Sequence, residues 1–250
     1  CMTMALTVRK YSKMQNIKGL ILRINSPGGT VGGTQELYNE ILSFRSKGKI
    51  AIASFGDVCA SGGYYLAMAC DHIIAQRGSM TGSIGVIVNT FNLSGIMERF
   101  GIKSVVIKAG KFKDILNFSR DVTQEEIQLI QNLVDDTYGQ FFEAVRKSRK
   151  DVPIEKLKEI CDGRIFTGNI AKNLKMVDEL GGYFQALEAM KRLAKLPDEP
   201  RVLTHKTSSL LDILNLFRNG DSENKIAAKL KEVLSKSEFS SPFLYLYTGL

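Results

Sequence analysis

Short apolar runs, each closed by glycine or small polar residues, dominate the first third of the chain. Residues 18–25 (KGLILRIN), 49–56 (KIAIASFG) and 71–76 (DHIIAQ) have the length and composition of buried strands. Between the first two, residues 34–44 repeat apolar side chains at steps of three and four, the period of a helix face. Strands and helices therefore alternate, which predicts right-handed crossovers and a largely parallel sheet with flanking helices.

The same alternation continues through the middle of the chain. A helix rich in small residues is predicted over 61–69, and another around Ile96. The apolar run 103–110 (KSVVIKAG) predicts a further strand. Thr123 and Glu126 have the spacing of a capping box and predict the start of the longest helix. The fold class is therefore α/β.

The composition changes near the C-terminal fifth of the chain. Residues 196–201 (LPDEPR) break the pattern and lead into a tail rich in Lys and Leu. Two amphipathic stretches, 208–218 and 224–236, predict helices there. We therefore divide the chain into a main domain, residues 1–200, and a helical C-terminal extension, residues 201–250.

The last twelve residues, 239–250 (FSSPFLYLYTGL), place five large apolar side chains directly after Pro242. Left exposed, such a segment would promote aggregation, so we expect it to dock. It can pack as an edge strand on its own subunit or on a neighbour.

Composition and charge narrow the class of protein. At 250 residues, 44% hydrophobic and 24% charged, the chain can bury a core and is neither disordered nor fibrous. Its 34 basic and 26 acidic residues give a net charge of +8, spread too evenly to make nucleic acid the expected partner. Four cysteines without CxxC spacing indicate no metal site and no cofactor.

The sequence shows neither a run of 18 apolar residues nor a cleavable leader. It begins abruptly at Cys1, next to a predicted helix over 6–14. We therefore expect that upstream sequence, and any membrane anchor within it, is missing.

Two segments place glycine or serine directly after a predicted strand, where such residues can contact a ligand or act as a nucleophile. The glycines of the turn 25–29 (NSPGG) let the backbone bend sharply and approach a ligand, although a simple tight turn also explains them. Ser61, in DVCASGGYY (57–65), lies between a strand and a helix, which suits a nucleophile or a helix N-cap. A nucleophilic serine needs a base, but His72 is placed in a strand and His205 in the tail. A lysine base is the common alternative.

Several ordered segments resemble the signal peptide peptidase SppA family, serine peptidases of the S49 type. The resemblance covers roughly residues 7–195. The segments together are more specific than any single segment, because the NSPGG turn also occurs in Clp protease and crotonase-like folds. The segments are INSPGG (24–29), GDVCASGGYYLA (56–67), TGSIGV (81–86), KAGKFKD (108–114), DGRIFTG (162–168) and VDELGG (177–182).

The resemblance implies a Clp protease/crotonase-like fold and a Ser-Lys dyad, with Ser61 as nucleophile and Lys113 as general base. The hydroxyl of Ser83 would hold the neutral lysine by a hydrogen bond. A lysine base must be uncharged near neutral pH, which requires a pKa about 3 units below its usual value of about 10.4. Burial away from carboxylates acts in that direction, so we expect Asp114 to point away from the base.

The family resemblance also implies the remaining parts of the site. Gly28 and Gly29 would supply backbone donors to the oxyanion, and the N–H of Gly62 would be a further donor. The expected substrates are hydrophobic peptides such as remnant signal peptides. Residues 239–250 resemble such a peptide and can alternatively lie as an added strand in a peptide groove near Ser61. The expected assembly is a homo-oligomer with active sites near subunit interfaces, attached to the bacterial cytoplasmic membrane with the catalytic domain outside the cytoplasm.

Two alternative functions use the same sequence features. A crotonase-like acyl-CoA enzyme would use the glycine turn as an oxyanion hole but would need neither Ser61 nor Lys113. A non-catalytic oligomeric membrane scaffold would keep the fold without turnover.

Overall fold

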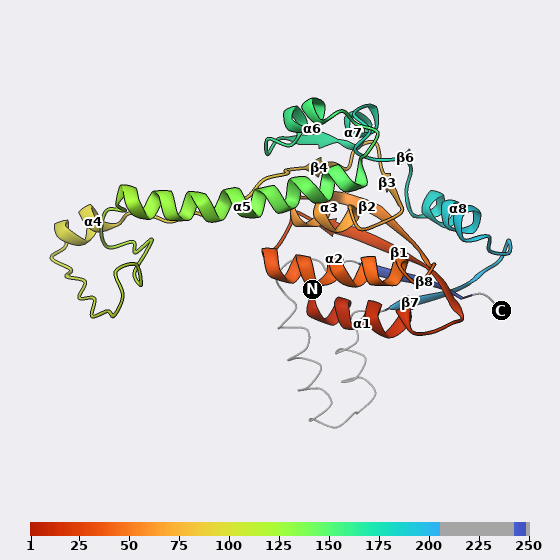
Figure 1. Ribbon diagram of the computed structural model, residues 1–250, viewed down its shortest axis with the longest axis horizontal. Coiled ribbons are helices and arrows are strands. Elements are labelled where there is room, and N and C mark those ends of the chain that lie inside the picture. Colours follow the sequence, from red (N-terminus) through yellow and green to blue (C-terminus); the bar gives the residue numbers. More distant parts are fainter. Residues whose placement is uncertain (206–242, 249–250) are drawn as a thin grey trace, which may run out of the picture. The chain divides into compact units, whose positions relative to one another are not determined.

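The computed structural model describes residues 1–205 and 243–248 (Figure 1). The chain divides into two compact units, residues 1–84 with 144–250 and residues 85–143, and each is described by itself. The helical stretches predicted over 208–218 and 224–236 lie outside the described residues.

Eight strands of the first unit form one sheet. They are β1 (Ile17–Ser26), β2 (Ile50–Ala60), β3 (His72–Ala75), β4 (Met80–Gly82), β5 (Ile165–Thr167), β6 (Glu179–Leu180), β7 (Arg201–His205) and β8 (Phe243–Thr248). The main path runs β5-β4-β2-β1-β8-β7, and β3 pairs with both β2 and β6. The pairs β1–β2, β2–β3, β2–β4 and β3–β6 are parallel, whereas β5, β7 and β8 join antiparallel. The predicted α/β fold with a largely parallel sheet is confirmed.

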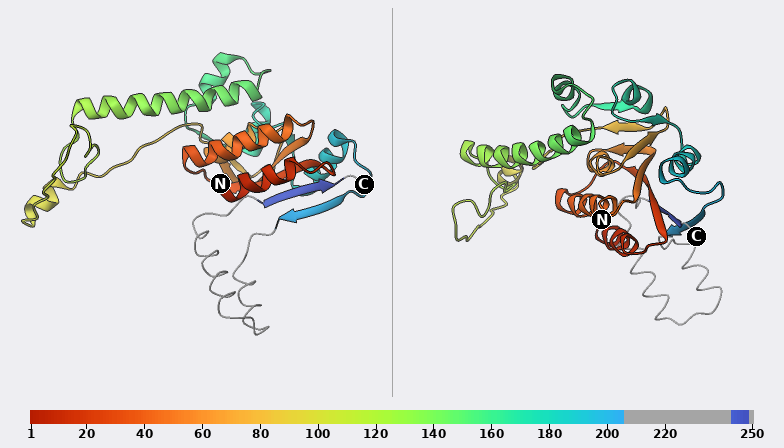
Figure 2. Two further views of the ribbon diagram at one scale, coloured as in Figure 1. Left: turned by 60° about the horizontal axis from the view of Figure 1, so that its bottom comes forward. Right: turned by 45° about the vertical axis from the view of Figure 1, so that its right-hand side comes forward.

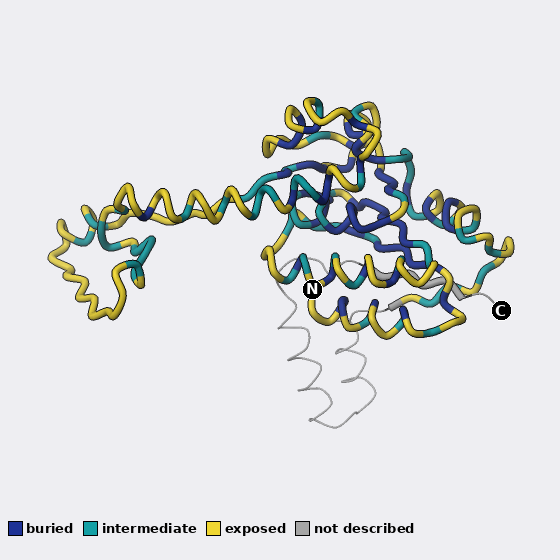
Figure 3. The backbone as a smooth tube through the Cα atoms, viewed as in Figure 1, coloured by how far each residue is buried: buried dark blue, intermediate teal, exposed yellow. Residues whose placement is uncertain are grey.

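Helices cover both faces of this sheet. They are α1 (Met2–Ser12), α2 (Val31–Arg45), α3 (Gly62–Ala67), α6 (Ile154–Ile160), α7 (Gly168–Asn173) and α8 (Tyr183–Ala194). Figure 2 shows α1, α2 and α3 on one face and α8 on the other. The strands between these layers are almost fully buried (Figure 3), which explains why their sequences are continuous apolar runs.

The core beneath α8 depends on one glycine. Isoleucines 21, 52 and 74 pack there against two alanines and Met190 of α8. A Cβ on Gly19 of β1 would lie 2.2 Å from the Met190 sulfur, so a larger residue there would displace the Met190 side chain. Burial of this apolar layer supplies the main driving force for docking α8.

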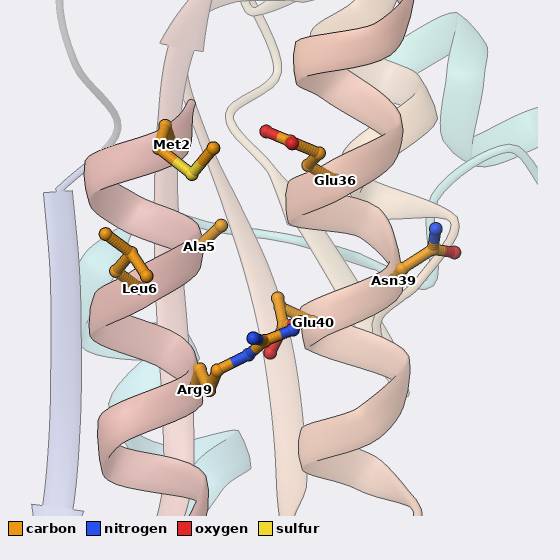
Figure 4. Close-up of a pocket in the computed structure, with 7 residues that line it drawn as sticks. All are labelled: Met2, Ala5, Leu6, Arg9, Glu36, Asn39 and Glu40. Atoms are coloured by element: carbon orange, nitrogen blue, oxygen red, sulfur yellow. Dashed lines mark hydrogen bonds and ion pairs between the residues drawn. The ribbon is translucent and has the colours of Figure 1, made fainter.

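The outer helices α1 and α2 pack against each other and are joined by an ion pair. Arg9 of α1 reaches Glu40 of α2 with an N–O distance of 2.6 Å (Figure 4). Beside this pair, Met2 and Leu6 border a surface pocket of about 340 Å³. None of the predicted catalytic residues lines this pocket.

The long helix α5 (Gln124–Ser148) belongs to both units, and its C-terminal end is fastened within the first. Arg149, which is 8% exposed, places Nη1 2.5 Å from Oδ1 of Asp178. Oδ2 of Asp178 accepts a hydrogen bond from the N–H of Ile73 in β3. The aspartate of VDELGG therefore links the end of α5 to the sheet.

The second unit contains α4 (Ser94–Arg99) and most of α5. The predicted capping box is confirmed, because the N–H of Thr123 donates to Glu126 and the N–H of Glu126 donates to the Thr123 hydroxyl. Arg120 also binds Glu126, and these contacts lower the pKa of the Glu126 carboxyl to about 2. The start of α5 is thus fixed by local polar contacts.

The strand predicted over 103–110 is wrong. The structure gives these residues no regular secondary structure, and Val105 and Ile107 are 83% and 97% exposed. A strand is stable only when a neighbour accepts its backbone hydrogen bonds, and no described strand pairs with this segment. The apolar run is real, but nothing in the described chain covers it.

The C-terminal apolar segment docks on its own subunit. Residues 243–248 form β8 and pair antiparallel with 17–23 of β1 on one side and with β7 on the other. The structure therefore does not place residues 243–248 in a peptide groove beside Ser61. Among the described strands β7, rather than β8, lies at the edge, and the boundary predicted at residue 200 stays a prediction.

Replacing Gly168 by Ala tests how tightly α7 is docked. A Cβ at Gly168 would lie 2.0 Å from the backbone oxygen of Gln76, so the variant must displace α7. We expect a loss of about 1–3 kcal/mol in the free energy of unfolding, measured by denaturant titration. Gly139→Ala in α5 is the matched control, because a Cβ there meets no atom within 4 Å. Equal stability of both variants would contradict the packing described.

Candidate active site

A bulge in β2 sets the geometry of the site. The pairing of β1 with β2 advances from Ile24↔Phe55 to Ser26↔Cys59, so β2 contains extra residues at this point. Asn25 spans the bulge, since its Oδ1 accepts a hydrogen bond of 3.0 Å from the N–H of Val58. The bulge allows β2 to continue as far as Ala60, beyond the end predicted from sequence.

Ser61 follows β2 directly and has a strained backbone. Its φ of 49° and ψ of −122° lie in a region that residues other than glycine rarely adopt. Ser61 occupies the N-cap position of α3, as the sequence allowed, but its side chain makes no capping hydrogen bond. Burial raises the pKa of the nearby Cys59 thiol, so that thiol stays neutral. Ser61 therefore remains the candidate nucleophile on this turn.

The glycine turn after β1 lies against Ser61. A Cβ on Gly28 would be 3.0 Å from the Ser61 Cβ and 3.3 Å from its Oγ. A Cβ on Gly62 would be 3.1 Å from the backbone nitrogen of Gly29. Gly28 has a φ of 139°, which also favours glycine. The structure therefore brings together four of the predicted site residues.

The two glycines of the turn differ in their hydrogen bonds. The N–H of Gly28 donates to the Ser26 hydroxyl at 3.2 Å, and that hydroxyl donates to the Gly28 oxygen at 3.0 Å. Among the described residues, no acceptor is found for the N–H of Gly29. Gly62 is the first residue of α3, where helix N–H groups have no carbonyl partner within the helix. Gly29 and Gly62 are thus better placed than Gly28 as free donors.

Ser83 directly follows β4, the strand that pairs with the end of β2. In the parallel β2–β4 pair Ala60 is opposite Gly82, so Ser61 and Ser83 both follow the last paired positions. The N–H of Ser61 donates to the oxygen of Gly82 at 2.9 Å. The N–H of Ser83 donates to the oxygen of Arg164 at 2.8 Å, which ties the turn to the DGRIFTG segment. Both serines therefore emerge at one edge of the sheet.

Lys113 belongs to the second unit, and its position relative to Ser61 is not defined. It lies in a turn near the start of α5, and its side chain is exposed rather than buried as expected. The Asp114 carboxylate instead binds Lys108 and Arg120, which lower its pKa. Asp114 therefore points to other partners, as the sequence argument requires for a lysine base.

The sheet, the strained serine and the adjacent glycine N–H groups define the class of serine peptidases. The chain belongs to peptidase family S49, whose sequence profile matches residues 43–197. This range includes Ser61, Ser83 and Lys113, whereas Gly28 and Gly29 precede it.

The similarity to individual proteins extends over most of the chain. It is 42% identical over 235 residues to a protein of Synechocystis sp. with a provisional protease name, covering 91% of this chain and 84% of that protein. It is 34% identical over 213 residues to the chloroplastic serine protease SPPA of Arabidopsis thaliana, covering 83% of this chain and 31% of that protein. It is 32% identical over 211 residues to protease 4 of Salmonella typhi, covering 80% and 34%. The chain thus spans only about a third of the last two proteins.

Sequence reasoning missed two residues that support the site. Asn25 was part of the NSPGG segment, but its contact with Val58 depends on a bulge that sequence does not reveal. Thr34 of α2 is buried, and its Oγ1 lies 3.0 Å from where a Cβ on Gly62 would be. Thr34 was not singled out from the sequence, although it lies three residues before the buried Leu37 on the same face of α2.

Replacing Asn25 by Ala tests the bulge. The Val58 N–H then loses its acceptor, and the space beside Gly56 empties, since a Cβ there would lie 2.8 Å from Asn25. We expect the free energy of unfolding to fall by about 1–3 kcal/mol and peptidase activity to fall with it. Asn39→Ala, on the exposed side of α2, is the control and leaves both unchanged. Full activity in Asn25→Ala would show that the bulge does not position Ser61.

Proposed function

We propose that the protein is an endopeptidase that uses Ser61 and Lys113 as a catalytic dyad and cleaves hydrophobic peptides such as remnant signal peptides. The observation that carries this proposal is the strained Ser61 backbone, with the glycine N–H groups beside it. Strain of this kind persists only where the surrounding structure enforces it, and it is common at nucleophiles. Membership of peptidase family S49 supports the same chemistry.

The chemistry proceeds through an acyl-enzyme. The neutral amine of Lys113 takes the proton of the Ser61 hydroxyl as Oγ attacks the scissile carbonyl carbon. The resulting ammonium then gives that proton to the leaving amine as the peptide C–N bond breaks. Water, deprotonated by the same lysine, hydrolyses the ester and restores the serine. Ser83 positions the lysine by accepting a hydrogen bond from it.

The tetrahedral oxyanion is bound by the N–H groups of Gly29 and Gly62. Gly28 completes the turn, and its N–H can contribute only after leaving the Ser26 hydroxyl. Donors that are fixed before the reaction stabilise the charge without further reorganisation, and loss of one donor costs about 100- to 1000-fold in rate.

Assembly into a homo-oligomer completes the site, with Lys113 supplied by a neighbouring subunit. The exposure of Lys113 and the large apolar surface of the second unit support this arrangement. Burial at the interface would desolvate the lysine and favour its neutral form. The exposed apolar residues of this unit include Ile87, Val88, Phe91, Leu93, Ile96, Phe100, Ile102, Val105, Val106, Ile107, Phe118, Ile127, Leu129 and Leu133.

The proposed substrates are produced at membranes, so we place the enzyme at the bacterial cytoplasmic membrane with its catalytic domain outside the cytoplasm. Within the residues that the structure describes, no helix is both long and apolar enough to cross a bilayer. Attachment to the membrane is therefore part of the proposal.

Alanine variants test the dyad and the origin of the lysine. Ser61→Ala and Lys113→Ala should each lower hydrolysis of a fluorogenic apolar peptide by about 1000-fold or more, because the two residues act as one unit. Ser46→Ala and Lys103→Ala, both exposed, are the matched controls and keep full activity. Near-normal rates in Lys113→Ala would eliminate the dyad.

Mixing the two inactive variants distinguishes the origin of the lysine. If each site takes serine and lysine from different subunits, an equal mixture regains activity at roughly a quarter of its sites after subunit exchange. No recovery, with mixed oligomers verified by native mass spectrometry, would place both residues in one subunit.

The pH dependence tests the nature of the base. A lysine must lose its proton before it can act, so kcat/KM rises with pH through a midpoint well below about 10.4. The Lys113→Ala variant should lose this rise. A profile that is flat between about pH 6 and 9, with chemistry shown to limit the rate, would exclude a lysine base.

A further inference from the structure

Four lysines gather around a pocket at the end of the sheet opposite to Ser61. The pocket has a volume of about 480 Å³ and lies where β1 and β2 begin, whereas Ser61 follows the end of β2. Three chain segments contribute to it: the end of α1, the start of β1 and the loop between α2 and β2. The lysines are Lys13, Lys18, Lys47 and Lys49.

The positive charge of this lysine pocket is not neutralised by the protein. No Asp or Glu occurs among the residues that line it, and none of the four lysines forms an ion pair with a described residue. Burial, together with the nearby charges of Lys47 and Lys18, lowers the pKa of the Lys49 ammonium. These charges are therefore close enough to repel one another.

Helix capping accounts for part of the cluster only. Lys49 donates to the backbone oxygens of Tyr11 and Met14 at 3.2 and 2.5 Å, and so compensates the negative end of α1. Lys47 donates to the Ser12 hydroxyl at 2.8 Å. Lys13 and Lys18 have exposed side chains and make no such contact among the described residues. One capping lysine compensates the helix end, so the charges of Lys13 and Lys18 remain available to an anion in the pocket.

We propose that the lysine pocket binds a phosphate group, with Lys13, Lys18 and Lys47 around the anion and Lys49 at its base. A phosphate would relieve the repulsion and accept several charge-assisted hydrogen bonds. The phosphate can belong to a lipid headgroup or to a free anion such as pyrophosphate. The site is separate from the catalytic residues and does not depend on the proposed peptidase chemistry.

Binding by the purified 250-residue chain tests the proposal in two arms. Pyrophosphate binding is measured by calorimetry, and membrane binding by sedimentation with phosphatidylcholine vesicles with and without phosphatidylglycerol. The variant Lys13→Gln/Lys18→Gln removes two charges without removing a capping contact. Lys150→Gln/Lys158→Gln, at exposed positions away from the pocket, removes the same total charge. We expect a loss of roughly fivefold in affinity per lysine in the pocket variant only.

The two arms identify the source of the phosphate. Pocket-dependent binding to vesicles that contain phosphatidylglycerol, but not to pyrophosphate, assigns a lipid headgroup, and the opposite result assigns a free anion. Lys13→Arg/Lys18→Arg keeps the charge and should retain binding, while thermal melting verifies folding of every variant. The proposal is overturned if both double Gln variants lose affinity equally or if the native chain binds neither probe.

Discussion

The parallel pairing of β1 with β2 is the constraint on which the rest of the protein depends. Each of these strands is buried on both faces, and together they hold α8 on one side and the α2–α3 layer on the other. The bulge in β2 adds residues to β2 relative to β1, and the hydrogen bond from the Val58 N–H to Asn25 holds the bulge in place. Consequently Ser61 meets the glycine turn that follows β1. A one-residue change in this register would bury different side chains and separate the two turns.

The sequence predicts the parts of this arrangement that are local. The spacing of apolar residues predicts β1, α2, β2 and β3. The capping box predicts the start of α5, because Thr123 and Glu126 hydrogen-bond to each other without distant partners. The family resemblance brings Ser61, Ser83 and the glycines to notice because their segments are distinctive. The contact between Ser61 and the glycines arises from strand order, which the sequence does not reveal.

What the sequence does not predict depends on distant partners. The run 103–110 has the composition of a strand, but composition does not supply the neighbour that a strand requires. The short strands β5 and β6 carry too few residues for a period and exist because β4 and β3 pair with them. The burial expected for Lys113 likewise depends on what covers the second unit, and the described residues leave its side chain exposed.

The position of β8 has a consequence for synthesis. Ile21 in β1 pairs with Tyr245 in β8, so a contact near the centre of the sheet joins residues from the two ends of the chain. Because a ribosome releases the N-terminal part first, β1 has one open edge until β8, which follows it by roughly 200 residues, has emerged. An open apolar edge invites pairing with other chains. The edge of β1 is therefore covered only once β8 has been synthesised, which makes residues 243–248 a determinant of folding efficiency as well as of structure.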